Sequence, residues 1–268
     1  MIRSAIKKFV KEKIYNKYLN WKGSFTYFGE KVFFHKGSIA FDYMKNGVYE
    51  WDNLRFILGN IRENSTYFDV GANIGLMSLP VLKQFKDVKV VSIEASPTTF
   101  EYLNSTRNIS SIKDKWQLIN RAISDTAGTE IDFYTASSKN NAYQSMKNTA
   151  RVDFSEIIKI VTITIDEIWN DLKQPDVSFI KSDVEGADLL AIKGGKSCIA
   201  KCKPAILLEW NSLNIVPFGF KNEDLLNLCK DIDYQCYALP AINKITTQFE
   251  LFQNGLTTES YLLLPNKR

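Results

Sequence analysis

The chain has 268 residues, a formal net charge of +4 and a sequence pI of about 8.7, which predicts one large domain or one domain with an extension. Hydrophobic residues make up 45% of the chain and charged residues 24%, values typical of a soluble globular protein. The mild excess of basic residues does not require a nucleic-acid partner. A core of this size needs neither disulfides nor a structural metal.

Histidine and cysteine usage narrows the possible chemistry. The only histidine is His35, and it lies far in sequence from the four cysteines, none of which forms a C-x-x-C pair. This pattern argues against a zinc site and predicts reduced thiols in the core. Where a proton has to be removed, a carboxylate, lysine or tyrosine is the expected base. The four cysteines are Cys198, Cys202, Cys229 and Cys236.

Residues 1–49 are interpreted as an N-terminal extension that holds a basic helix and short strands. Near its start, apolar residues recur at helical spacing with lysines between them. Such a helix either packs on its own domain, which the pattern favours, or lies on anionic lipid. We find no apolar run of about 18 residues and no secretory signal, so we expect a cytoplasmic protein, with peripheral contact at the inner face of the membrane as the open alternative. The apolar positions are Ile2, Ile6, Phe9 and Val10, and the lysines are Lys7, Lys8, Lys11 and Lys13.

From about residue 50, apolar strands alternate with helical patterns, which predicts an α/β domain with a parallel sheet over residues 50–268. Residues 136–150 are polar and predict a loop that is a candidate lid. The expected strands are residues 66–70, 88–93, 118–123, 129–135, 161–165, 177–180 and 205–208, with two more near Tyr234 and Tyr261. The expected helices are residues 76–85, 97–108, 187–193 and 223–230.

A glycine-bearing turn follows the first of these strands, at Asp69 to Gly75. Asn73 occupies a position where glycine is common, and asparagine tolerates a left-handed backbone. Glu94 closes the next strand, near the spacing of a carboxylate that binds ribose hydroxyls. Asp69 would repel a pyrophosphate but suits a cationic ligand, which favours S-adenosylmethionine over NAD. The alternative is a strand–helix connection without a ligand.

A second acidic segment follows a buried strand, at Lys181 to Gly186. We expect Asp183 and Glu185 to face the Gly71 turn, with Lys181 on the same face as Asp183. These carboxylates can accept the proton of an acceptor hydroxyl, or together with Glu209 hold a divalent cation. A purely structural alternative has Asp183 capping the following helix and Glu185 paired with Lys181.

Together these motifs resemble the FkbM family of methyltransferases. The resemblance covers about residues 64–210, and the combination of GANIG with K-x-DVEGA is its specific part. The matching segments are FDVGANIGLMSL (68–79), SIEASPTTFEYL (92–103), RAISDTAGT (121–129), TIDEI (164–168), FIKSDVEGADLLAIKGG (179–195) and KPAILLEW (203–210).

This resemblance implies a Rossmann-like methyltransferase fold with a mostly parallel central sheet and helices on both faces. It also implies S-adenosylmethionine as donor and O-methylation, as in family members that act on sugar and polyketide hydroxyls. Ser182 departs from the apolar residue usual in the family, and we expect it to face away from the site. By position, Asp69, Gly71, Ala72, Asn73 and Gly75 correspond to the donor turn, Glu94 and Ala95 to the ribose contact, Ser124 and Asp125 to the adenine contact, and Asp183, Glu185 and Glu209 to the catalytic acids.

Several other functions are compatible with parts of this pattern. A nucleic-acid or other N-methyltransferase is the first, but the segment SDVEG stands where exocyclic-amine methyltransferases usually carry Asn/Asp-Pro-Pro-aromatic. Two carboxylates there would repel a phosphate backbone. A non-catalytic module that binds the donor or a glycan is the second, and an NAD oxidoreductase is the most distant. We expect a small-molecule or glycan acceptor, such as a surface glycan or its lipid-linked precursor, and no nucleic acid.

Overall fold

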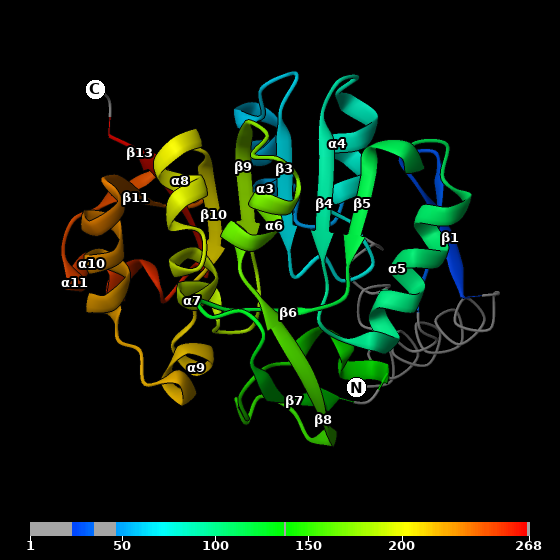
Figure 1. Cartoon of the computed structure of the whole chain (residues 1–268). Helices are drawn as coiled ribbons and strands as arrows, with labels where there is room; N and C mark the ends of the chain where they lie inside the picture. The colour runs from blue at the N-terminus through cyan, green and yellow to red at the C-terminus, as the bar shows by residue number, and fades with distance from the viewer. Residues whose placement is uncertain (1–22, 35–46, 137, 267–268) are drawn as a thin grey trace, which may run out of the picture.

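The computed structural model describes residues 23–34, 47–136 and 138–266. The runs of β-branched residues form one sheet in the order β12-β11-β13-β10-β9-β3-β4-β5, in which β10, β9, β3, β4 and β5 are parallel (Figure 1). The remaining three strands are antiparallel to their neighbours: β13 pairs with β10 and β11, and β12 pairs with β11. The strands are β3 (Thr66–Val70), β4 (Lys89–Ile93), β5 (Trp116–Ile119), β9 (Val177–Ser182), β10 (Ala205–Glu209), β11 (Tyr234–Ala238), β12 (Asn243–Ile245) and β13 (Ser260–Pro265).

Helices cover both faces of this sheet, as the predicted Rossmann-like fold requires. Side chains alternate along each strand, so Tyr67 packs in one apolar cluster and its neighbours Phe68 and Val70 in the other. The Tyr67 face carries α3 (Trp51–Asn60), α4 (Ser78–Gln84) and α5 (Pro97–Ile109). The other face carries α6 (Ile165–Asp171), α7 (Asp188–Lys193), α8 (Lys196–Cys202), α10 (Asn222–Ile232) and α11 (Gln248–Asn254).

A second, three-stranded sheet lies beyond the carboxyl ends of the parallel strands (Figure 1). Its order is β6-β8-β7, with β6 (Ala122–Ile123), β7 (Glu130–Ala136) and β8 (Phe154–Ile163). The expected single strand over residues 118–123 is therefore wrong, because β5 and β6 belong to different sheets. Asn120 lies between them, and its side-chain amide donates to the carbonyl of Glu94 at 2.8 Å. This bond holds the chain where it leaves the large sheet for the small one.

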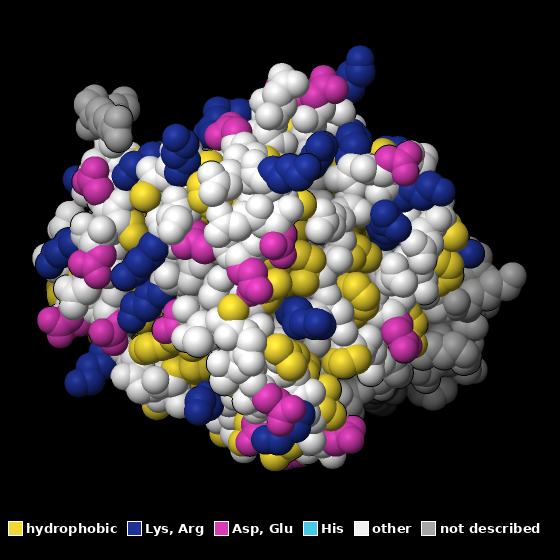
Figure 2. Space-filling view, viewed as in Figure 1, with side chains coloured by type: hydrophobic (Ala, Val, Ile, Leu, Met, Phe, Trp, Pro, Cys, Tyr) yellow, Lys and Arg dark blue, Asp and Glu magenta, His cyan; other side chains and the backbone are white. Residues whose placement is uncertain are grey.

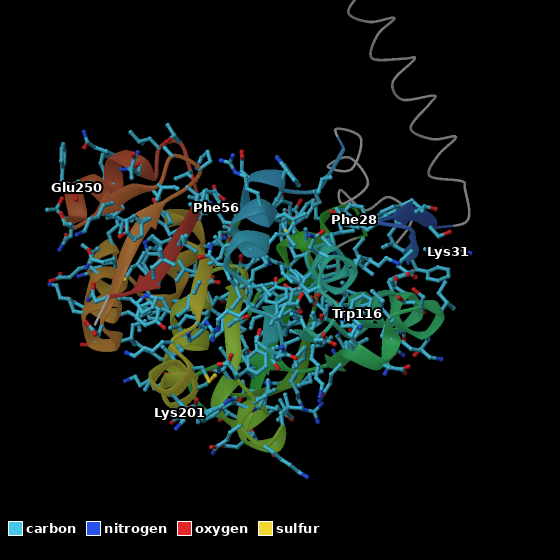
Figure 3. The ribbon with its side chains drawn as sticks, turned by 90° about the horizontal axis from the view of Figure 1, so that it is seen from above. Phe28, Lys31, Phe56, Trp116, Lys201 and Glu250 are labelled. Atoms are coloured by element: carbon cyan, nitrogen blue, oxygen red, sulfur yellow. The ribbon has the colours of Figure 1, made fainter. Side chains whose placement is uncertain are left out.

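The N-terminal extension contributes an antiparallel hairpin, β1 (Ser24–Tyr27) and β2 (Glu30–Phe33), in agreement with the expected short strands. The hairpin packs on α5, where the amide of Phe33 donates to Thr106 Oγ1 at 2.9 Å. Seen from above, its residues Phe28 and Lys31 lie at the opposite edge of the molecule from Glu250 of α11 (Figure 3). The predicted basic helix, and the domain boundary at residue 50, stay predictions, since residues 1–22 and 35–46 lie outside the described residues.

All four cysteines are free thiols, and Cys198, Cys229 and Cys236 are buried. The prediction of reduced thiols in the core is confirmed for these three, while Cys202 is half-buried. Within the described ranges, no helix has both the length and the apolar character to cross a lipid bilayer.

Helix α3 was not expected from the sequence, and it anchors the Tyr67 face of the sheet. Leu54 and Ile57 are fully buried there. We expect Ile57→Ala to lower the free energy of unfolding by about 2–5 kcal/mol, because it removes buried methylene groups and leaves a cavity. Urea unfolding followed by circular dichroism measures this change. Arg55→Ala on the exposed side of the same helix should change it by no more than about 0.5 kcal/mol, and an equal loss in both variants would contradict the packing described.

Candidate active site

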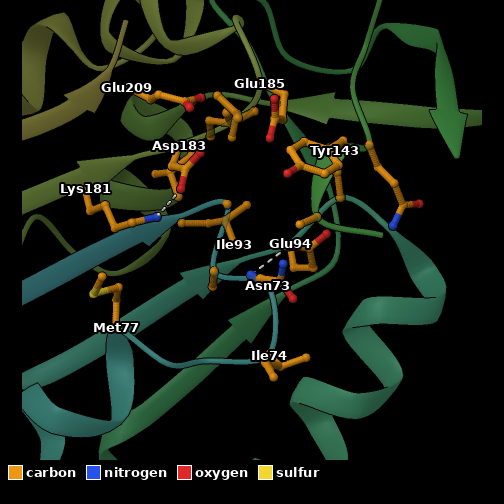
Figure 4. Close-up of a pocket in the computed structure, with 18 of the residues that line it drawn as sticks. Asn73, Ile74, Met77, Ile93, Glu94, Tyr143, Lys181, Asp183, Glu185 and Glu209 are labelled. Carbon is orange, nitrogen blue, oxygen red and sulfur yellow. Dashed lines mark hydrogen bonds and ion pairs between the residues drawn. The ribbon is translucent and has the colours of Figure 1, made fainter. Parts of the chain in front are cut away.

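A cavity of about 500 Å³ lies at the carboxyl ends of β3, β4, β9 and β10, and the small sheet closes it from the other side (Figure 4). This edge of an open α/β sheet is where ligands bind, because the loops that follow the parallel strands converge there. The volume falls within the ~300–1,000 Å³ of sites for small ligands. We therefore take this cavity as the candidate active site.

The loop after β3 forms the floor of the cavity. Gly71 has a φ of 75°, and a Cβ atom at this position would lie 1.8 Å from the carbonyl oxygen of Asp183. Any other residue would push the two loops apart. The amide of Asp183 also donates to the carbonyl of Val70 at 3.1 Å. The Gly71 turn and the acidic segment are thus in direct contact, as predicted from the strand order.

Asn73 adopts a φ of 50°, so the left-handed conformation expected of an asparagine here is confirmed. Its amide nitrogen donates to Glu94 Oε2 at 2.9 Å, while its side-chain Oδ1 is buried and accepts no hydrogen bond (Figure 4). A buried acceptor without a donor costs roughly 1–3 kcal/mol. Asn73 Oδ1 is therefore placed to accept a hydrogen bond from a ligand, and Ala72 lines the cavity beside it.

Glu94 projects into the cavity from the end of β4, with Ala95 next to it. Its two oxygens accept from backbone amides, Oε2 from Asn73 and Oε1 from Ser96 at 2.9 Å each. Burial raises the pKa of Glu94 to about 7, although these two amides act in the opposite direction. Each carboxylate oxygen keeps a free lone pair, so the group can accept hydroxyl hydrogens of a ligand.

Two residues of the predicted donor turn lie outside the cavity wall. Asp69 is fully buried and accepts from Ser78 Oγ at 2.5 Å, and its other oxygen lies 3.9 Å from Lys181 Nζ. Strand alternation directs its side chain beneath the cavity floor, and the predicted contact of Asp69 with a cationic ligand stays a prediction. Gly75 packs on Trp116, whose ring would lie 2.8 Å from a Cβ atom there. Its role is to allow this packing.

The predicted catalytic acids Asp183, Glu185 and Glu209 come together, with one carboxylate oxygen of each within 4.8 Å of the others. Burial, followed by the charge of Asp183, raises the pKa of Glu185 to about 8. The same two causes, with Glu185 as a third, raise the pKa of Glu209 well above its ordinary value. Both shifts favour the neutral form, while the Arg151 guanidinium, 2.9 Å from Glu185 Oε2, acts in the opposite direction on Glu185.

Lys181 is the cation of this cluster and is almost fully buried. Its Nζ donates to Asp183 Oδ2 at 3.2 Å (Figure 4). Although burial disfavours the ammonium, Asp183 and Asp69 raise the pKa of Lys181. The purely structural alternative for this segment is therefore wrong. Asp183 pairs with Lys181, and the helix that follows begins after Ala187 without a side-chain cap.

Ser182 faces away from the cavity, as expected, and donates to Asp188 Oδ1 at 2.7 Å. The second oxygen of Asp188 accepts from the amide of Gly186 at 3.3 Å. Gly186 has a φ of 98°, and a Cβ atom there would lie 2.2 Å from the carbonyl oxygen of Asn214. The acidic segment is thus held from behind by Asp188 and packed closely against α9 (Ser212–Ile215).

Asn214 of α9 joins Glu185 and Glu209. Its Nδ2 donates to Glu185 Oε2 at 2.8 Å and to Glu209 Oε2 at 3.0 Å. Its Oδ1 accepts from Arg151 Nη1 at 3.0 Å, and Arg151 also donates to Glu185 Oε2 at 2.9 Å. A single buried amide therefore fixes the positions of three charged or titratable side chains.

The polar segment between β7 and β8 covers the cavity where a lid was expected. It contains the short helix η2 (Ser138–Tyr143), and the cavity wall includes Tyr143, Gln144 and Met146. Ser145 Oγ donates to the carbonyl of Glu185 at 2.9 Å, and the Arg151 guanidinium lies 4.8 Å from the centre of the Tyr143 ring. The lid segment is thus joined to the acidic segment at both Ser145 and Arg151.

The predicted adenine contacts Ser124 and Asp125 do not line the cavity. The amide of Ser124 donates to Ile163 of β8, and its carbonyl packs on Gly194. Because the chain leaves β5 for the small sheet, the cavity wall here is formed by the preceding residues. These are Arg121, Ala122 and Ile123, together with Phe133 of β7.

Sequence reasoning did not single out several polar residues at the site, among them Glu50, Arg151 and Glu259 of the cavity wall and Asn214 behind it. Glu259 directly precedes β13, and the start of an antiparallel strand lies at the same edge as the ends of its parallel neighbours. The strand pattern therefore contained a signal for Glu259. Arg151 and Asn214 reach the site through loop geometry, for which the sequence has no comparable pattern.

The three clustered acids are also the described residues whose oxygens could hold a divalent cation. Arg151 and Asn214 donate to Oε2 of Glu185, and Asn214 donates to Oε2 of Glu209, so one oxygen of each carboxyl group is already engaged by protein donors. The carboxyl groups are thus already part of a hydrogen-bond network, and their remaining oxygens can form hydrogen bonds with a bound ligand.

Comparisons with known proteins point to one family. The family model described as the methyltransferase FkbM domain matches residues 69–236. A curated relative, methyltransferase sdnD of Sordaria araneosa, is 25% identical over 163 residues, which cover 51% of this chain and 62% of that protein. The chain thus spans less than two thirds of the length of this relative.

Two solved structures are similar to this chain. The crystal structure of methyltransferase FkbM from Methylobacillus flagellatus has 18% sequence identity and a TM-score of 0.49, over 80% of this chain and 47% of that one. A TehB-like SAM-dependent methyltransferase from Corynebacterium glutamicum has 11% identity and a TM-score of 0.45, over 85% and 94%.

The raised pKa of Glu185 predicts a dependence of stability on pH. A carboxyl group whose pKa is about 8 in the fold and ordinary in the unfolded chain stabilises the fold while it is protonated, and this contribution is lost as the pH rises through about 8. We expect the free energy of unfolding to fall between about pH 6 and about pH 9. Glu185→Gln stays neutral and should reduce this fall, as measured by urea unfolding at both pH values.

Glu101→Gln on the exposed side of α5 is the control and should keep the wild-type pH dependence. An unchanged pH dependence in Glu185→Gln would contradict the assignment of a neutral Glu185.

Proposed function

The chain belongs to the FkbM family of methyltransferases, and we propose that it transfers the methyl group of S-adenosylmethionine to a hydroxyl oxygen of a sugar or another small molecule. The observation that carries the choice of acceptor is the group of three mutually close carboxyl groups, one of which belongs to Asp183, whose backbone packs against Gly71. Such a group can orient a hydroxyl and accept its proton.

The residues around the turn fit S-adenosylmethionine. Asn73 Oδ1 is a buried acceptor without a donor, and Glu94 has free lone pairs for ribose hydroxyls. Gly71 keeps the floor of the cavity free of side-chain atoms. The wall has six carboxyl-bearing residues and three cationic residues, so it offers a polar ligand both hydrogen-bond acceptors and donors. These residues are Glu50, Glu94, Asp183, Glu185, Glu209 and Glu259 against Arg121, Arg151 and Lys181.

When bound, S-adenosylmethionine supplies an electrophilic methyl group, and its sulfur keeps the electron pair of the broken carbon–sulfur bond. The task of the protein is then to hold the acceptor oxygen in line and to remove its proton. We assign proton acceptance to Asp183, which is ion-paired with Lys181. Glu185 and Glu209, whose raised pKa values favour the neutral form, donate hydrogen bonds that orient the acceptor.

This assignment requires no metal ion, since the carboxylate of Asp183 itself is the base. Turnover in the presence of EDTA should equal turnover without it. A loss of turnover that Mg²⁺ restores would favour a bound cation in place of the carboxylate base.

The charge distribution disfavours a nucleic-acid acceptor. On the face seen in Figure 2, basic and acidic side chains of the described residues are interspersed and form no continuous basic band. The carboxyl groups of the cavity would repel a phosphate backbone. We propose a surface glycan or its lipid-linked precursor as acceptor, with the protein in the cytoplasm or at the inner face of the membrane. The lysines interleaved with apolar residues near the start of the chain support this location.

Glu94→Gln tests the donor site. We expect its affinity for S-adenosylmethionine to fall by roughly tenfold or more, because a hydrogen bond to a charged group contributes ~1.5–3 kcal/mol. In the wild type, affinity should also weaken as the pH falls below about 7, where Glu94 is protonated. Titration calorimetry at several pH values measures both effects. Glu101→Gln is the control, and equal affinity with an unchanged pH dependence in Glu94→Gln would refute the ribose contact.

Asp183→Asn tests the acceptor side. We expect turnover to fall by ~10²–10⁴ while donor affinity stays near that of the wild type, because a positioned base contributes about this factor. Mass spectrometry of glycans incubated with enzyme and donor measures turnover, and calorimetry measures donor binding. The exposed Asp87→Asn should leave both unchanged. Full turnover in Asp183→Asn would end its assignment as the base.

A further inference from the structure

A second cavity of about 330 Å³ adjoins the first on the α3 side of the sheet. It lies between the start of α3 and the loop that leads into β13. Five residues line both cavities, so the two cavities adjoin at these side chains, which we call the shared wall. These residues are Glu50, Lys181, Asp183, Glu209 and Glu259.

Away from the shared wall, the second cavity is lined by Leu207 and Leu208 and by a set of hydroxyl and amide side chains. Asn53 Nδ2 donates to Ser260 Oγ and to Glu50 Oε2, both at 2.9 Å. Thr258 Oγ1 accepts from the amide of Ser260 at 3.1 Å, and Thr257 Oγ1 donates to the carbonyl of Asn254 at 3.1 Å. These side chains are held in place by their own hydrogen bonds, and their remaining donors and acceptors are available to a ligand.

The charge of this cavity indicates the class of ligand. Its only cation among the described lining residues, Lys181, is already paired with Asp183 and lies close to Asp69. An anionic ligand would therefore meet carboxyl groups without a free positive partner. Burial and the charge of Asp183 raise the pKa of Glu50, and Glu209 is likewise stabilised as a neutral acid. The wall thus offers hydrogen-bond donors and acceptors at a low net charge.

We propose that the second cavity is the acceptor subsite and that it takes an uncharged, polyhydroxylated ring such as a neutral sugar. This inference rests on the proposed function, since it takes the first cavity as the donor site. A ring held by Asn53, Thr257 and Thr258 places one hydroxyl at the shared wall, where Asp183 and Glu209 also face the donor cavity. The oxygen then forms the bond to the methyl carbon, its proton passes to Asp183, and the sulfur leaves with the electron pair.

Ligand-observed NMR tests this subsite with the full chain saturated with S-adenosylhomocysteine. The probes are methyl glucoside as the neutral sugar, glucuronic acid as the anionic sugar and glucosamine as the cationic sugar. We expect saturation transfer to methyl glucoside and none to glucuronic acid. Thr257→Phe should abolish the signal, because the exposed Thr257 lines only the second of the two cavities and a phenyl ring there would fill it.

Thr98→Phe, at an exposed threonine of α5 outside both cavities, is the matched control and should keep the signal. Asn53→Leu is a second variant and should weaken the signal by removing the amide. Calorimetry with S-adenosylhomocysteine on each variant verifies that the donor site is intact.

The possible failures are distinguishable. Equal signals in wild type and Thr257→Phe, or no signal in a wild type that binds S-adenosylhomocysteine, would overturn the subsite and leave the proposed function standing. A stronger signal for glucosamine or glucuronic acid than for methyl glucoside would overturn the ligand class. A glucoside signal that Thr257→Phe removes, in a protein that methylates no hydroxyl acceptor, would support the subsite and refute the proposed function.

Discussion

The contact between Gly71 and the backbone of Asp183 is the constraint on which the site depends. A Cβ atom at Gly71 would lie 1.8 Å from the Asp183 carbonyl oxygen, so the two loops can meet only because this side chain is absent. Parallel pairing of β3 with β9 brings the loops to the same edge, and the amide of Asp183 continues the ladder by donating to Val70. The donor turn and the acidic segment therefore form one rigid unit.

Strand alternation then determines the electrostatics of this unit. Asp69 is opposite Lys181 in the register of β3 and β9, and Asp183 and Glu209 follow on the same face. A buried ammonium between two carboxylates lowers the cost of placing so many acids together, since each charge has an opposite neighbour. Lys181 is thus the residue that makes an acidic wall compatible with a folded core. Asp69 belongs to this arrangement, and for that reason it lies beneath the cavity floor.

The elements that the sequence predicted well are those with strong periodicity and sharp boundaries. The strands at residues 66–70 and 205–208 and the helix from Pro97 follow from β-branched runs and a proline at the first turn, and each lies within one or two residues of its expected bounds. The segment at residues 118–123 was misread, because two strands of different sheets are adjacent in sequence there and only a hydrogen bond from Asn120 marks the turn. The expected adenine contacts, Ser124 and Asp125, were placed directly after this strand, whereas Arg121, Ala122 and Ile123 line the cavity.

Four acids of the candidate site, Glu94, Asp183, Glu185 and Glu209, could be predicted because each one ends a parallel strand or lies in the loop directly after one. The residues that organise them could not. Arg151 and Asn214 come from a lid and from a four-residue helix, 34 and 29 positions from Glu185, and neither position follows from a repeat or a motif. Sequence periodicity reports which face of an element is buried, whereas the approach of a loop side chain depends on the whole path of the chain.

A wall of carboxyl groups shared by two cavities meets a requirement particular to group transfer. Two reactants must be held in line at one point, and this alignment is worth up to ~7–11 kcal/mol of the barrier. In the proposed reaction, Glu185 and Glu209 donate to the acceptor hydroxyl and the ion-paired Asp183 accepts its proton, so one cluster would serve both orientation and proton removal. Asn214 binds both Glu185 and Glu209, and Arg151 binds Asn214 and Glu185, so the segment between β7 and β8 is held to the acidic cluster by the same hydrogen bonds that position its carboxyl groups.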